Sequence, residues 1–143
     1  MFYSNNTNDT RQVFFLSWAH YCNKEPLSPL EAQIVDVIIA HPEYHALLSS
    51  PANAASASYS AILGETNPFL HMGLHLALRE QIQTDRPKGI ADIYQRLLLK
   101  YQSILDTEHA MMDHLSDCLW LAQKNQTMPN EQSYLAQLNT LLK

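Results

Sequence analysis

Two histidines one helical turn apart are the feature of this sequence most closely tied to chemistry. His71 and His75 are four positions apart within NPFLHMGLH. Residues four apart lie on the same face of an α-helix, so both imidazoles can reach one ion, as in helical zinc sites. The spacing therefore predicts a metal site without indicating a reaction.

Further histidines and one carboxylate add to these candidates. His41 and His45 begin and end the segment HPEYH, and His109 follows Glu108. Projected at about 100° per residue, Glu108 falls at the centre of an apolar helical stripe. A buried carboxylate is costly unless it is paired, hydrogen-bonded or bound to metal, so a partner has to face it. Imidazoles that hold a cation would meet this need.

The predicted site combines residues from several helices. The expected ligands are His45, His71, His75 and Glu108, and the expected neighbours of these ligands are His41, His109 and Tyr44. The expected cofactor is a divalent metal ion, because zinc, iron and nickel all suit imidazole and carboxylate donors. No catalytic residue is identified, although Glu43 and Glu65 are candidates for a base near the metal. No nucleotide or phosphate-binding motif occurs, so no other cofactor is expected.

Two alternatives remain open from the sequence. Core histidines can hydrogen-bond backbone carbonyls and a buried glutamate, forming a polar network without metal. Pro42 interrupts its helix, so His41 and His45 can cap helix ends instead of sharing one face. Glu80 projects to the side opposite His71 and His75, and Arg79 lies on the flank, so both are expected to be solvated rather than ligands.

Apolar periodicity and helix-boundary residues predict the elements that position these side chains. Asp9 can cap a first helix that ends near residue 21, and Asn67 with Pro68 marks the start of a helix that reaches about residue 84. Other expected helices cover residues 30–48, interrupted at Pro42, residues 90 to about 123 with a possible break near Asp106, and a short segment after residue 130. An Ala/Ser-rich connection spans about residues 49–66.

These elements predict an all-α fold. The expected architecture is a four-helix-bundle-like core of antiparallel helices with an additional short C-terminal helix, in a single helical domain over residues 1–143. Only 3 glycines occur, which disfavours the many turns of an all-β fold.

Composition excludes several classes of function. The formal net charge is −5, from 9 basic and 14 acidic residues, so neither nucleic acid nor an anionic membrane surface is an expected partner. The N-terminal segment lacks the pattern of a signal peptide, and no apolar run is long enough to span a bilayer. Cys22 and Cys118 form no metal or disulfide motif. A cytoplasmic location is therefore expected.

Four segments resemble a bacterial family that is known only as a domain of unknown function. They are HPEYH at residues 41–45, NPFLHMGLHLALREQ at 67–81, DRPKG at 85–89 and EHAMM at 108–112. The resemblance covers most of the chain and supports the architecture and these positions, but it implies no reaction. A looser similarity exists to histidine-rich bundles of the hemerythrin and DinB type, in which histidines and carboxylates of several helices bind iron, zinc or nickel.

Two hypotheses of different classes follow. In the first, the protein is a metal-binding helical bundle, with an undefined small-molecule substrate if it is an enzyme. In the second, it is a non-enzymatic interaction or structural module, in which the histidines and the glutamate form a metal-free network. Self-association into a homo-oligomer fits the second hypothesis.

Overall fold

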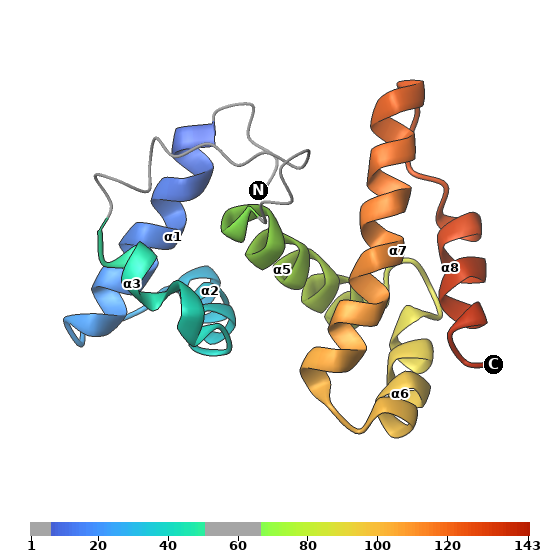
Figure 1. Ribbon diagram of the computed structural model, residues 1–143, viewed down its shortest axis with the longest axis horizontal. Helices are drawn as coiled ribbons and strands as arrows, with labels where there is room; N and C mark the ends of the chain where they lie inside the picture. Colours follow the sequence, from blue (N-terminus) through green and yellow to red (C-terminus); the bar gives the residue numbers. More distant parts are fainter. Residues whose placement is uncertain (1–6, 51–66) are drawn as a thin grey trace. The chain divides into compact units, whose positions relative to one another are not determined.

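The computed structural model describes residues 7–50 and 67–143, and all regular structure in these residues is helical (Figure 1). This confirms the predicted all-α class. The chain divides into two compact units, Met1–Leu76 and Ala77–Lys143. The single domain and the antiparallel bundle stay predictions. Most of the Ala/Ser-rich connection, with Glu65, lies outside the described residues.

The helices of the first unit have the expected order. They are α1 (Thr7–Cys22), α2 (Pro29–Ile39), the 3₁₀ helix η1 (Pro42–Tyr44), α3 (His45–Leu48) and the first part of α5 (Pro68–Thr84). Asp9 lies inside α1 rather than at its start, which reflects how weakly single residues define helix ends. Ser28 caps α2 through a capping box with Glu31, because each side chain accepts a hydrogen bond from the other residue's backbone N–H.

Pro42 divides the helix expected over residues 30–48. A proline has no N–H to continue the α-helical hydrogen-bond ladder, and it disfavours helical dihedrals in the residue before it. Accordingly, α2 ends at Ile39, and His41 has the non-helical dihedrals φ −126° and ψ 70°. The chain then resumes as η1 and α3. This confirms the predicted interruption. After Pro42, the HPEYH segment turns back along the end of α2.

Aromatic and aliphatic side chains form the core of the first unit. Phe14, Phe15 and Trp18 of α1 are buried, and both phenylalanines pack against Phe69 of α5, with ring centroids 5.9 and 5.7 Å apart. The core comprises Phe14, Phe15, Trp18, Ile34, Val37, Ile38, Leu48, Phe69, Met72 and Leu76. It joins α2 and the start of α5 in one unit; His41 follows α2, and His71 and His75 lie on α5.

The second unit contains the end of α5 and three further helices. These are α6 (Ile90–Tyr101), α7 (Ile104–Asn125) and α8 (Glu131–Thr140). The long helix expected from residue 90 is broken at Gln102, which has the left-handed φ of 55°, and Ser103 caps α7 by accepting a hydrogen bond from the N–H of Asp106. The possible break near Asp106 is therefore real, and the capping serine sets its position.

The last helix packs through two apolar residues. Tyr134 and Leu138 of α8 are buried, and the Tyr134 hydroxyl donates to Oε1 of Gln81 at 2.8 Å.

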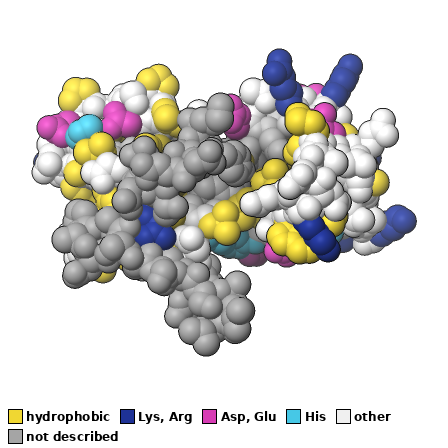
Figure 2. Space-filling view, turned by 90° about the horizontal axis from the view of Figure 1, so that it is seen from above, with side chains coloured by type: hydrophobic (Ala, Val, Ile, Leu, Met, Phe, Trp, Pro, Cys, Tyr) yellow, Lys and Arg dark blue, Asp and Glu magenta, His cyan; other side chains and the backbone are white. Residues whose placement is uncertain are grey.

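No described helix combines enough length and apolarity to cross a membrane. Among the described residues drawn in Figure 2, most Lys and Arg side chains are separated from one another by side chains of other kinds.

Candidate metal centre

The first two turns of α5 place His71 and His75 next to each other. The side chain of Asn67 starts this helix, because its Oδ1 accepts hydrogen bonds from the N–H groups of Phe69 and Leu70. The two Nε2 atoms of His71 and His75 are 3.2 Å apart, and the ring centroids are 4.8 Å apart. His75 is fully buried and His71 is partly exposed. The predicted shared face is therefore present.

A third imidazole comes from the end of α2. The His41 ring lies 5.1 Å from the His71 ring and 4.7 Å from the His75 ring, measured between centroids. Only 4% of His41 is exposed. The ligand nitrogens of His41, His71 and His75 all lie within 4.8 Å of one another. Three histidines of the first unit are thus close enough to hold a metal ion.

These distances fit a common metal-ion geometry. At a metal–nitrogen distance of about 2.0–2.1 Å and a tetrahedral angle, two ligand nitrogens are about 3.3 Å apart. The observed separation of 3.2 Å between the His71 and His75 nitrogens matches this value. Ring centroids in such a site are about 5 Å apart, and the three observed separations range from 4.7 to 5.1 Å.

Hydrogen bonding sets the tautomer of His41. Its Nδ1 lies 2.8 Å from the carbonyl oxygen of Val37. A carbonyl oxygen can only accept, so Nδ1 carries the proton, and Nε2 of the neutral ring keeps its lone pair. Metal-binding histidines commonly donate their second N–H to a backbone carbonyl in this way, which orients the ring. The last turn of α2 thus orients His41, which follows the helix, as a ligand.

The short distance between the Nε2 atoms of His71 and His75 limits where protons can lie on the two rings. Two Nε2 atoms 3.2 Å apart can share at most one proton without repulsion between two N–H groups. Without metal, this contact is an N–H···N hydrogen bond, which is the metal-free network left open by the sequence. With metal, the same short separation requires both nitrogens to present lone pairs. Both states use nearly the same positions of the rings.

His45 has a different contact from the one expected of a ligand. Its Nε2 donates to the carbonyl oxygen of Ile38 at 2.8 Å, and its ring packs on Trp18 with centroids 4.5 Å apart. Ile38 belongs to the last turn of α2, whose carbonyls lack partners within the helix. The capping alternative considered for HPEYH therefore describes the contact of His45. His45 is not a member of the histidine group.

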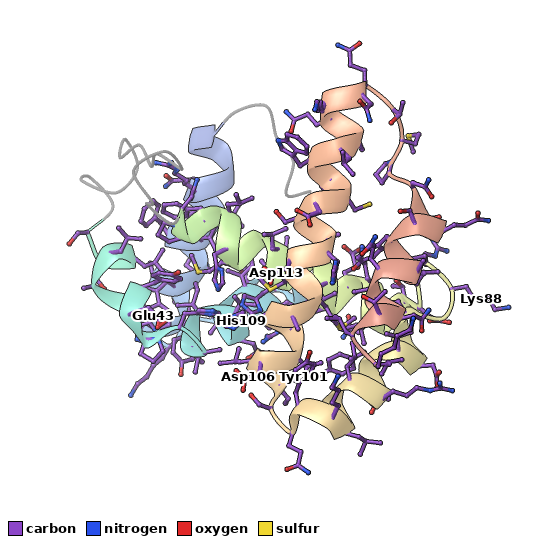
Figure 3. The ribbon with its side chains drawn as sticks, turned by 45° about the vertical axis from the view of Figure 1, so that its right-hand side comes forward. Glu43, Lys88, Tyr101, Asp106, His109 and Asp113 are labelled. Carbon is purple, nitrogen blue, oxygen red and sulfur yellow. The ribbon has the colours of Figure 1, made fainter. Side chains whose placement is uncertain are left out.

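Tyr44 lies against the histidine group. Its ring is stacked on His41 with centroids 5.5 Å apart and planes 7° apart, and it meets His71 edge-on at 6.4 Å. Burial, followed by the charge of Glu43, raises the pKa of the Tyr44 hydroxyl. The hydroxyl is therefore protonated at neutral pH. Glu43 itself is exposed on η1, where Figure 3 labels it.

Glu108 belongs to the second unit and has a partner there. Only 2% of it is exposed, as its place in the apolar stripe predicted. Nε of Arg79 donates to both carboxylate oxygens, at 3.1 and 3.0 Å. The expectation that Arg79 is solvated was wrong, because its side chain is 30% exposed and turns along α5 toward α7. A long arginine on the flank of a helix can reach a buried acid that a projection of Cα positions leaves out.

The remaining candidates lie in the second unit. Glu80 is exposed, as expected. His109, labelled in Figure 3, lies on α7 directly after Glu108, and both are described with the second unit. The burial of Tyr94 and then the charge of Glu108 raise the pKa of the Tyr94 hydroxyl. The coordinating role expected of Glu108 and the neighbouring role expected of His109 stay predictions.

The chain was compared with protein families, with curated proteins and with solved structures. No curated protein and no solved structure matches it. One family model matches residues 6–140, a range that includes all the histidines described above. Because this match covers most of the chain, the chain belongs to the family described as "Domain of unknown function (DUF1841)".

Proposed function

We propose that this protein binds a divalent transition-metal ion through His41, His71 and His75 of its first unit. The observation that carries this proposal is the convergence of three imidazoles, one from the segment between α2 and η1 and two from α5, with ligand nitrogens within 4.8 Å of one another. The separation of 3.2 Å between the His71 and His75 nitrogens supports it, because it equals the spacing between ligands on one tetrahedral ion.

The proposed ligand set differs from the one expected from the sequence in two members: it takes His41 instead of His45 from HPEYH, and it does not include Glu108 of the second unit. His41 replaces His45, since the Nδ1–H of His41 is bonded to Val37 and its Nε2 is directed by that bond. Nε2 of His45 is bonded to Ile38 instead. These two carbonyl contacts support different roles for the two histidines of the segment.

Three imidazole donors suit borderline metals such as zinc, nickel and iron. Three protein ligands leave at least one position of a tetrahedral ion to another donor, which is the ligand count of catalytic rather than closed structural zinc sites. The proposal therefore includes chemistry at the ion, such as polarising a bound oxygen or activating water, without naming a substrate.

Metal content of the protein, produced without a histidine tag, tests this proposal. Elemental mass spectrometry is expected to find close to one equivalent of metal per chain, either after purification or after addition of zinc, nickel or iron. His71→Ala is the preferred variant, because His71 is partly exposed and its loss leaves the smallest cavity. His114→Ala is the matched control, since His114 is a similarly half-buried histidine on α7.

Two results distinguish the proposal from a metal-free polar network. Metal loss in His71→Ala with an unchanged helical circular dichroism signal supports the metal site. If the parent protein takes up no metal while His71→Ala only lowers the melting temperature, the three histidines form the hydrogen-bonded network and the proposal fails.

A further inference from the structure

The three proposed ligands carry no negative charge. Imidazoles bind metal as neutral groups, so the ion keeps its full divalent charge. In the described part of the first unit, no carboxylate and no cysteine joins His41, His71 and His75 in the group. Sites that contain aspartate, glutamate or thiolate ligands compensate part of this charge within the protein. The donor set in the first unit compensates none of it.

The site is buried, so the charge of a bound ion would interact more strongly with its neighbours than in water. His75 is fully buried, and only 4% of His41 is exposed. Met72, one position from His71 on α5, is also fully buried and belongs to the apolar core of the unit. Interactions between charges are several times stronger in such surroundings than in water, because the effective dielectric constant is lower. An anion beside the ion is therefore favoured over a neutral ligand of the same size.

The nearby polar groups do not supply this anion in the first unit. Glu43 lies two positions from His41, but its side chain is exposed on η1. Tyr44, whose ring lies against His41 and His71, carries a phenol rather than a carboxylate. His71 is partly exposed, in contrast to the buried His41 and His75.

We propose that the metal-loaded site takes a small anion, such as a carboxylate, at the coordination position that the three histidines leave. This inference rests on the proposed function and names the class of ligand for the same site. The anion replaces a neutral solvent molecule on the ion, and no bond other than the coordination bond changes. A substrate of this site would therefore carry a carboxylate or another small anionic group.

Cobalt(II) is the probe, because its visible spectrum changes when a ligand in its coordination sphere is exchanged. The cobalt-loaded protein is titrated separately with acetate and with acetamide at constant ionic strength, maintained with perchlorate. These two ligands have nearly the same size and shape and differ in charge. We expect acetate to give a saturable spectral change, and acetamide to give none over the same concentration range.

A charge variant provides a second measurement. His71→Glu replaces a neutral ligand by an anionic one and lowers the charge of the loaded site by one unit. We expect this variant, when loaded with cobalt, to bind acetate at least about tenfold more weakly. His114→Ala is expected to match the parent protein in both titrations. If His71→Glu retains no cobalt, the comparison of acetate with acetamide in the parent protein decides alone.

The outcomes separate this inference from the proposed function. Cobalt that binds but responds to neither ligand means that protein donors occupy the remaining positions, which overturns the inference and leaves metal binding intact. Equal responses to acetate and acetamide overturn it too, because charge then has no role. Failure of the parent protein to bind cobalt or any other tested metal refutes the proposed function and the inference with it.

Discussion

The ion pair between Arg79 and Glu108 yields a prediction whose size follows from burial. Nε of Arg79 donates to both oxygens of Glu108, whose side chain is only 3% exposed, against 30% for Arg79. Removing one partner of a buried pair costs about 3–5 kcal/mol, because the other charge loses its compensation in a poorly solvated place. The partial exposure of Arg79 reduces this value, so Arg79→Met is expected to lower the free energy of unfolding by about 3 kcal/mol.

The pair is expected to show a strong asymmetry. Arg79→Met preserves much of the apolar stem but leaves the carboxylate without its guanidinium. Glu108→Gln removes the buried charge and retains a side chain of similar shape, so we expect a smaller loss of about 1–2 kcal/mol. The double variant is expected to resemble Glu108→Gln alone, which corresponds to a coupling free energy of about 3 kcal/mol, the full effect of Arg79→Met.

A second pair in the same unit is the matched control. Nε of Arg96 lies 3.0 Å from Oδ2 of Asp92, the same distance as in the buried pair, but these side chains are 65% and 68% exposed. Exposed pairs four residues apart on a helix contribute only about 0.3–0.5 kcal/mol. Arg96→Met is therefore expected to change stability by no more than this amount. Comparing the two ion pairs therefore separates the effect of burial on stability from the effect of distance.

Urea unfolding followed by circular dichroism measures all these variants. For a domain of this size, a loss of about 3 kcal/mol corresponds to a melting temperature lower by about 6–12 °C. Equal, small effects of Arg79→Met and Arg96→Met would refute the reasoning, because burial would then add nothing to the pair. Metal content is measured on the same samples, since Glu108→Gln also tests the coordinating role expected from the sequence.

Three further predictions concern single side chains. His45→Ala is expected to keep bound metal but to lower the free energy of unfolding by about 1–2 kcal/mol, because the contact with Ile38 is lost. His41→Ala is expected to lose the metal. The opposite result for the two variants in elemental mass spectrometry would restore His45 as the ligand. Tyr44→Phe keeps the ring stacked on His41 and is expected to keep the metal affinity of the parent protein. Tyr44→Leu is expected to weaken metal binding about tenfold, measured in competition with a chelator. Equal metal affinities of the two variants would show that Tyr44 does not position His41. Burial raises the pKa of the Cys118 thiol and Cys22 is exposed, so iodoacetamide is expected to alkylate Cys22 first at mildly alkaline pH, with the difference lost in urea; peptide mass spectrometry that finds faster labelling of Cys118 would contradict this.

The sequence alone determined features that depend on neighbouring residues along the chain. Pro42 predicted the interruption after α2, because a missing N–H and a clash with the preceding residue act locally. Asn67 and Pro68 predicted the start of α5 for a similar reason. The shared face of His71 and His75 follows from helical periodicity, which does not depend on the rest of the fold.

Only the tertiary structure decided which groups from different helices meet. HPEYH offered two histidines, and the turn at Pro42 together with the packing of α2 on α5 brought His41, rather than His45, to the other two rings. Glu108 was recognisable as buried, but its contact with Arg79 depends on how α5 and α7 pack and on the rotamers of a long side chain. Periodicity specifies which face of a helix is apolar, whereas the rotation and translation of one helix against another depend on packing over the whole core, and this is why the partners could not be read from spacing.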